Sequence, residues 1–134
     1  METPGLQSPP VMRRILAFSA IVEAGTGLAL VAAPAFVLSL LIGGTVAEGL
    51  RPLGRCFGIA ILALVMACWP GREPSGGPAA FRGLLSYNAL IALYLTVLGA
   101  AAQWRGLLLW PVVVLHALIA LALILLWRRR QMRR

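Results

Sequence analysis

The sequence is poor in charged residues and draws its charge from few residue types. It contains no aspartate and no lysine, and charged residues make up 12% of its 134 residues, about half the average for soluble proteins. Hydrophobic residues make up 60%, and the mean hydropathy is +0.90. A water-soluble domain of this length could not bury so much apolar surface. The composition therefore predicts a membrane protein that forms one compact domain.

Residues that bind metals or form disulfides are also scarce. His116 is the single histidine, so the chain cannot supply two histidine ligands to a haem. Cys56 and Cys68 lie in one apolar run about 18 Å apart at helical rise, too far for a disulfide within one chain. We interpret both as small buried hydrophobic residues. The sequence also lacks a metal-ligand cluster, a glycine-rich phosphate loop and a Ser-His-acid set, so we expect no enzyme activity, metal or cofactor.

The basic residues are all arginines and give the chain a net charge of +8. A nucleic-acid-binding protein would carry a basic face with residues that read bases, whereas these arginines lie at the ends of apolar runs. If both termini are cytoplasmic, nine arginines lie inside and three outside, which is a positive-inside bias. We therefore predict a multi-pass protein of the bacterial inner membrane, with no nucleic-acid partner. The three outer residues are Arg51, Arg55 and Arg105.

Four long apolar runs cover residues 15–33, 53–69, 83–102 and 107–127. Each is close to the ~20 residues that a membrane-spanning helix needs. The first run is longer than the apolar region of a signal peptide and carries Glu23, so we interpret it as a retained helix. The runs predict an all-α bundle of four transmembrane helices. Residues 1–12 would form a disordered polar tail, residues 13–127 the membrane domain and residues 128–134 a basic cytoplasmic tail.

The basic tail and the segment between the first two runs have separate expected roles. The tail should anchor the last helix and contact the headgroups of anionic lipids through Arg128, Arg129, Arg130, Arg133 and Arg134. Residues 35–42 are apolar but too short to cross a bilayer, so they predict an interfacial or re-entrant helix on the outer face.

Short motifs around the start of the second long helix make three further predictions. Thr45 and Glu48 match the T-x-x-E capping box, which predicts that the helix starts there. Pro52 would either kink this helix or restart it. Gly54 and Gly58 form a GxxxG motif, which indicates a close contact between helices.

A few polar residues lie deep in the apolar runs. At helical rise, Glu23 lies about 12 Å from the inner boundary and His116 about 12 Å from the outer one, so their levels differ by about 6 Å in a core of about 30 Å. Asn88 and Tyr87 lie about 8–9 Å from the inner side, and Tyr94 lies about 18 Å in, near His116. A four-helix bundle can point all of these residues inward. They form our candidate site for a ligand or a proton.

Each of these residues also has a structural interpretation. Polar side chains in membranes often act as contacts between helices, worth about 0.6 kcal/mol on average. For Glu23 a functional role is favoured, because an ionisable residue near the membrane centre is hard to explain by packing. For His116 the two interpretations are balanced, and for Asn88, Tyr87 and Tyr94 the structural one is favoured. Ser19 and Thr26 share a face with Glu23, but their hydroxyls can bond to their own helix.

The segment "ILAFSAIVEAGTG" resembles the first helix of the small multidrug resistance family. Members of that family have four spans and an essential membrane-embedded glutamate that exchanges protons for cationic drugs. The resemblance implies that Glu23 would take this role. It covers one helix, and the present chain is longer, with an additional outer segment and a stronger arginine bias.

The whole layout resembles DoxX-like four-helix bacterial membrane proteins. The residues that carry this resemblance are "RPLGRCFGIAIL", the asparagine of "SYNALIAL" and "WPVVVLHALIALAL". Some members of that group are associated with quinone-linked redox complexes. The resemblance implies a small accessory or binding subunit with an intramembrane site for a quinone or lipid, and possible assembly into a homo-oligomer or a larger membrane complex. The alternatives are a proton-coupled transporter that uses Glu23 and a purely structural subunit.

Overall fold

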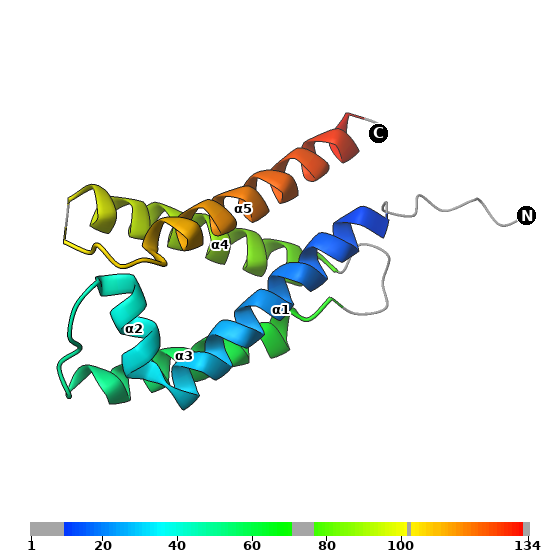
Figure 1. The fold of residues 1–134 in the computed structure, drawn as a ribbon. Coiled ribbons are helices and arrows are strands. Elements are labelled where there is room, and N and C mark those ends of the chain that lie inside the picture. Colours follow the sequence, from blue (N-terminus) through cyan, green and yellow to red (C-terminus); the bar gives the residue numbers. More distant parts are fainter. Residues whose placement is uncertain (1–9, 71–76, 102, 133–134) are drawn as a thin grey trace, which may run out of the picture.

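The computed structural model describes residues 10–70, 77–101 and 103–132, and this part of the chain is all-helical. Figure 1 shows its helices, which are α1 (Pro10–Ala32), α2 (Pro34–Ile42), α3 (Leu50–Cys68), α4 (Pro78–Ala100) and α5 (Leu109–Gln131). α1, α3, α4 and α5 are long and apolar enough to cross a membrane. The predicted fold, four long helices with a short helix between the first two, is therefore confirmed.

The first and last helices extend further than the apolar runs indicated. α1 begins at Pro10, where proline is tolerated because the first helical N–H has no partner within the helix, and Met12 is already buried. α5 continues through Arg128, Arg129 and Arg130 in its last turn, where positive charge interacts favourably with the helix dipole. Residues 10–12 and 128–131 are thus helical, and the predictions for residues 1–9 and 133–134 lie outside the described residues.

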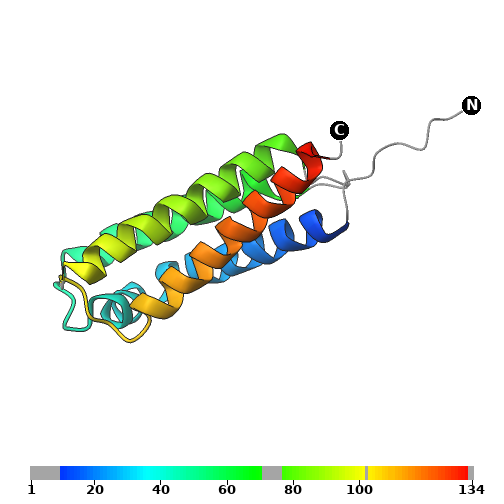
Figure 2. The same ribbon diagram turned by 90° about the horizontal axis from the view of Figure 1, so that it is seen from above.

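The four long helices form two tightly packed pairs. α1 packs mainly on α3 and α4 mainly on α5, whereas fewer contacts join one pair to the other. Figure 2 shows the long helices side by side, with the start of α1 and the end of α5 at one end of the bundle and α2 at the other. An even number of spans places these two helix ends on the same side of a membrane.

Glycines bring α1 and α3 into backbone contact. A Cβ atom added at Gly58 would lie 2.7 Å from the carbonyl oxygen of Gly27, and one added at Gly54 would lie 3.0 Å from Pro34 at the start of α2. Any larger residue at Gly58 would therefore push the two helices apart. The close helix contact predicted from the GxxxG motif is confirmed.

The short helix α2 is held by backbone hydrogen bonds from the segment between α4 and α5. The last carbonyl groups of a helix have no partner within it, and here the N–H groups of Arg105, Gly106 and Leu108 donate to the carbonyls of Ile42, Leu41 and Leu40 over 2.9–3.0 Å. A Cβ atom at Gly106 would overlap the backbone of Leu40. The sequence between α4 and α5 therefore completes the end of α2.

The predicted capping box is wrong. α3 begins at Leu50, after Gly49, and no side chain caps its first turn. Glu48 instead forms an exposed ion pair with Arg51, at 3.2 Å. Pro52 falls in the first turn of α3, where a missing N–H breaks no helical hydrogen bond, so it does not interrupt the helix.

The main core lies between α1, α3, α4 and α5 and is made of aliphatic side chains such as Leu16, Leu84 and Leu123, all fully buried. Many large apolar side chains face outward, as expected when the solvent is lipid. Cys68 is buried in this core, but Cys56 is exposed, so the prediction that both cysteines are buried is wrong for Cys56. Cys56 lies on the outward side of α3, where a small apolar side chain can face lipid.

Candidate functional site

Four buried polar side chains meet inside the bundle. Ser19 and Glu23 come from α1, Asn88 from α4 and His116 from α5; the first three have no exposed surface, and His116 is 5% exposed. Ser19 and Glu23 are one helical turn apart and share the face of α1 that points inward. The site therefore joins the α1/α3 pair to the α4/α5 pair. We call Ser19, Glu23, Asn88 and His116 the polar layer.

Asn88 is the centre of the polar layer. Its Nδ2 atom donates hydrogen bonds to the carbonyl oxygen of Leu84, at 2.7 Å, and to Ser19 Oγ, at 2.9 Å. A carbonyl oxygen can only accept, so the contact with Leu84 fixes which end of the amide carries the hydrogens. The Asn88 Oδ1 atom consequently faces His116, with which it makes a 2.8 Å contact.

This orientation fixes the proton on one nitrogen of His116. Asn88 Oδ1 is an acceptor, so His116 Nδ1 must donate and therefore carries a hydrogen. In the neutral ring Nε2 then holds the lone pair, and Nε2 is the nitrogen that gains or loses a proton. The Tyr87 ring packs edge-on against His116, with centroids 5.9 Å apart and the planes at 79°, which holds the imidazole in this orientation.

Glu23 is the member of the polar layer that lacks hydrogen bonds. Its Oε1 atom lies 3.5 Å from His116 Nδ1, whose hydrogen already points to Asn88. In the described part of the chain, neither carboxyl oxygen of Glu23 has a hydrogen-bond partner. Tyr87 lies near the same carboxyl group, but its hydroxyl makes no hydrogen bond to either oxygen. A buried carboxyl group in this position can hold a proton, pair with a protonated His116 or accept a hydrogen bond from a ligand.

The structure brings together four of the five residues that we predicted for the site. Glu23, His116 and Asn88 belong to the polar layer, and Tyr87 lies beside it. Tyr94 does not: it is 60% exposed. Tyr94 lies about 120° around α4 from Asn88, which places it on the lipid-facing side of the helix.

Ser19 is the polar-layer residue whose role the sequence did not reveal. We expected its hydroxyl to bond to its own helix, but it accepts a hydrogen bond from Asn88 across the interface. The sequence did contain one indication of this role: Ser19 lies one helical turn from Glu23 and therefore shares its inward face. Thr26 behaves as expected, since its hydroxyl donates to the Val22 carbonyl one turn earlier, at 3.0 Å.

Three of the arginines predicted to contact lipid headgroups lie in the last turn of α5, away from the polar layer. Arg128 and Arg129 are exposed, and Arg130 is half-buried. Arg133 and Arg134 lie outside the described residues. Placing guanidinium groups at the end of a spanning helix keeps them at the level of the headgroups.

Comparison of this chain with family models, with curated proteins and with solved structures finds no match in any of the three. Its function must therefore be inferred from the chemistry of the polar layer itself.

Proposed function

We propose that this chain is a small accessory or binding protein of the bacterial inner membrane, and that its polar layer binds the polar head of a quinone-type molecule or a lipid. The single observation that supports this proposal is the fully buried Glu23 carboxyl group, whose two oxygens lack hydrogen-bond partners within the described residues. An unpaired carboxylate inside a membrane protein costs several kcal/mol. A ligand that donates a hydrogen bond to Glu23 would remove much of that cost.

The chemistry of the polar layer favours a ligand with a hydroxyl group. When Glu23 is ionised, its carboxylate only accepts hydrogen bonds, and it would then pair with the hydroxyl of a reduced quinone or of a lipid. Asn88 uses its amide on Leu84, Ser19 and His116. Glu23 therefore has the free bonding capacity, while its neighbours hold His116 in a fixed orientation beside it.

We expect a ligand to enter the polar layer along the boundary between the two helix pairs. Glu23 and Ser19 belong to the α1/α3 pair, and Asn88 and His116 belong to α4/α5, with fewer contacts between the pairs than within them. A molecule dissolved in the bilayer would reach Glu23 by separating the pairs slightly. Separation along this boundary leaves the glycine contact of α1 with α3 intact.

Arginine placement supports an orientation with both termini in the cytoplasm. Near the start of α1 and the end of α5, the described arginines are Arg13, Arg14, Arg82 and the three in the last turn of α5. The opposite end has Arg51, Arg55 and Arg105. The excess at the first end is the pattern of a cytoplasmic face.

The proposal is tested by binding of a short-chain benzoquinol and of a monoacylglycerol to purified protein in detergent. Glu23→Ala should lower the affinity for one of the two probes roughly ten- to hundredfold, because a hydrogen bond to a charged group contributes about 1.5–3 kcal/mol. Thr26→Val is the matched control on the same helix, since its hydroxyl bonds to its own backbone, and it should leave affinity unchanged. Equal losses in both variants, or no binding to the wild type, would contradict the proposal.

A proton-coupled transporter is the second candidate, and the short distance between Glu23 and His116 favours it. Glu23 Oε1 and His116 Nδ1 lie 3.5 Å apart at the boundary between the two helix pairs. A transporter would require the two pairs to move relative to one another. In proteoliposomes with an imposed pH gradient, a transporter would move a lipophilic cation such as ethidium, and Glu23→Gln would stop that movement. A binding protein would leave the gradient unchanged. A purely structural subunit would show neither binding nor transport, and Glu23→Gln would be mild.

A further inference from the structure

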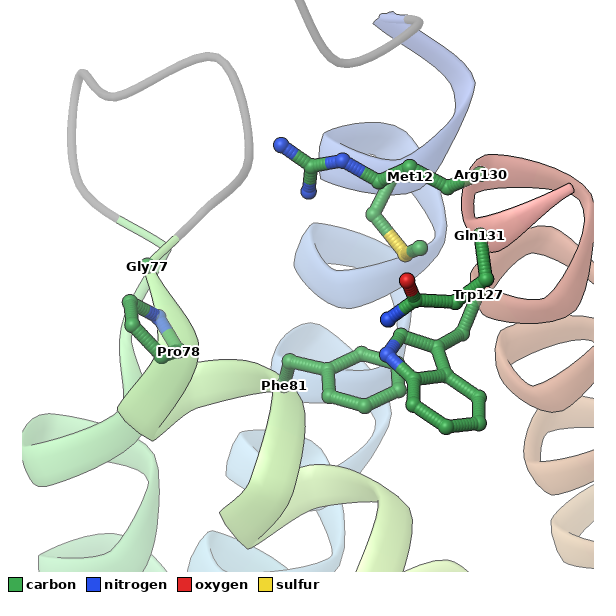
Figure 3. A pocket seen from close by; sticks show the side chains of 7 residues that line it. All are labelled: Met12, Gly77, Pro78, Phe81, Trp127, Arg130 and Gln131. Carbon is green, nitrogen blue, oxygen red and sulfur yellow. The ribbon is translucent and has the colours of Figure 1, made fainter. Parts of the chain in front are cut away.

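A concave site lies at the end of the bundle where α1 begins and α5 ends. It is a hollow of about 320 Å³ between the first turns of α1 and α4 and the last turn of α5. Figure 3 shows Met12, Phe81, Trp127, Arg130 and Gln131 around it. Its volume is at the lower end of the range of ligand pockets, about 300–1,000 Å³.

The hollow has an apolar wall and a basic side. Met12, Phe81 and Trp127 supply the apolar wall, and Figure 3 shows the Phe81 and Trp127 rings next to each other. Arg130 supplies the charge, and in Figure 3 its guanidinium extends from α5 in the direction of the start of α4. A tryptophan beside an arginine at the end of a spanning helix is typical of the level where acyl chains meet headgroups.

The wider surroundings of the hollow are positively charged. Arg13 and Arg14 lie in the first turns of α1, Arg82 lies in the first turns of α4, and Arg128 and Arg129 precede Arg130. Within the described residues, every charged side chain at this end of the bundle is an arginine. Basic pockets between helices on a cytoplasmic face suit the headgroups of anionic lipids.

We propose that this hollow binds one anionic phospholipid. Its phosphate is held by Arg130, because guanidinium pairs with phosphate through two parallel hydrogen bonds, and the start of its acyl chains lies on Met12, Phe81 and Trp127. A phospholipid carries a phosphate and apolar chains in the same order as the hollow presents Arg130 and its apolar wall. The site is separate from the polar layer and does not depend on the function proposed for it.

Native mass spectrometry of delipidated protein with phosphatidylglycerol or phosphatidylcholine tests this site. We expect Arg130→Gln to weaken phosphatidylglycerol binding about tenfold. Arg129→Gln, the matched control, removes the same charge from a neighbouring exposed position and should change affinity less than about twofold. Phosphatidylcholine should bind more weakly to the wild type and show little response to either variant.

Two further arms separate a lipid site from diffuse charge attraction and from a site for free phosphate. Gln131→Trp fills the hollow without altering charge, and it should also weaken phosphatidylglycerol binding. Inorganic phosphate at millimolar concentration should not displace the lipid, because it cannot use the apolar wall. Equal losses for Arg129→Gln and Arg130→Gln would overturn the proposal in favour of diffuse charge attraction. Displacement of the lipid by phosphate, or full binding in Gln131→Trp, would also overturn it.

Discussion

At the scale of single residues, Asn88 determines the geometry of the polar layer. Its amide is held by the Leu84 carbonyl, and this contact leaves Oδ1 pointing at His116. Ser19 accepts the other amide hydrogen. One asparagine thus connects three helices and sets the position of the proton on His116, while Glu23 is left with unused bonding capacity.

Replacing Asn88 should cost more than replacing its partner Ser19. Ser19→Ala removes one contact between helices, worth about 0.6 kcal/mol on average, whereas Asn88→Ala also leaves His116 Nδ1 without its acceptor, so we expect about 1–2 kcal/mol. The double variant should cost less than the sum, because both changes remove the same hydrogen bond. Unfolding in detergent with increasing SDS measures all three. If the two single losses of stability add up to that of the double variant within about 0.5 kcal/mol, the Ser19–Asn88 hydrogen bond is contradicted.

Glu23→Gln should preserve the fold. The amide has nearly the same shape and sheds a buried charge that lacks hydrogen-bond partners in the described part of the chain, so stability should equal or slightly exceed that of the wild type. Glu23→Ala serves as the comparison, because it leaves a cavity and should destabilise. The measurement is the thermal unfolding midpoint in detergent. A clear loss of stability in Glu23→Gln would mean that the carboxylate has a structural partner, such as a charged His116.

At the scale of helices, glycine positions determine which helices can touch. α1 and α3 meet where Gly27 and Gly58 oppose each other, and Gly54 makes room for Pro34 of α2. Small residues allow this approach in a membrane, where association depends on close packing rather than on exclusion of water. The α1/α3 pair is therefore a tight unit, against which α4/α5 packs more loosely.

Gly58→Ala should destabilise the protein, because the added methyl group would lie 2.7 Å from the Gly27 carbonyl oxygen, a backbone atom that cannot rotate away. Overpacking of this kind costs about 1–3 kcal/mol. Gly25→Ala on α1 is the control: its methyl group would meet no atom within 4 Å, and we expect no loss. Titration with SDS compares the two. Similar stability in both variants would show that α1 and α3 do not approach this closely.

Gly106→Ala should detach α2 from residues 105–108, whose N–H groups bond to the last carbonyl groups of α2. The new methyl group would overlap the Leu40 carbonyl, so the hydrogen bonds from Arg105, Gly106 and Leu108 to α2 could not all persist. Gly44→Ala, with no atom within 4 Å of the added methyl group, is the control. A cysteine introduced at the partly buried Val37 of α2 should become more reactive towards an impermeant thiol reagent in Gly106→Ala alone. Unchanged labelling would show that α2 is held by other contacts.

At the scale of the whole molecule, the bundle places the start of α1 and the end of α5 at one end and α2 with the Arg105 segment at the other (Figure 2). The polar layer lies between these ends, and the basic hollow lies at the first of them. The two ends of the bundle therefore differ in charge and in structure. We expect each end to face a fixed side of the membrane.

We predict that the chain inserts in a single orientation with both termini in the cytoplasm, because arginines are concentrated at that end. Reporter fusions at each terminus test this: a fluorescent protein should be active and an alkaline phosphatase inactive at both. Moving three arginines from the last turn of α5 to the segment near Arg105 should weaken this preference. Periplasmic activity from either terminus of the wild type would contradict the prediction.

Part of the candidate site was predictable from residue type and depth. Glu23, His116 and Asn88 stand out because polar groups are costly in a long apolar run. Tyr94 was misplaced because two tyrosines seven residues apart share a face, yet the core covers Tyr87 and leaves Tyr94 exposed. Which side of a uniformly apolar helix faces lipid depends on its neighbours, and α5 has nearly the same hydrophobicity all round.

The sequence by itself determined the four spans and the short helix between the first two, because these depend on the length of each apolar run. The tertiary structure decided the partners. Ser19 bonds across the interface rather than to its own helix, Asn88 orients His116, and Glu23 remains unpaired within the described residues. Hydrogen bonds between helices depend on rotation and register, because donor and acceptor must meet within a narrow range of distance and angle. Contacts such as the one between Gly27 and Gly58 set the rotation and the register of the helices. The residue pattern along a single helix does not encode either quantity.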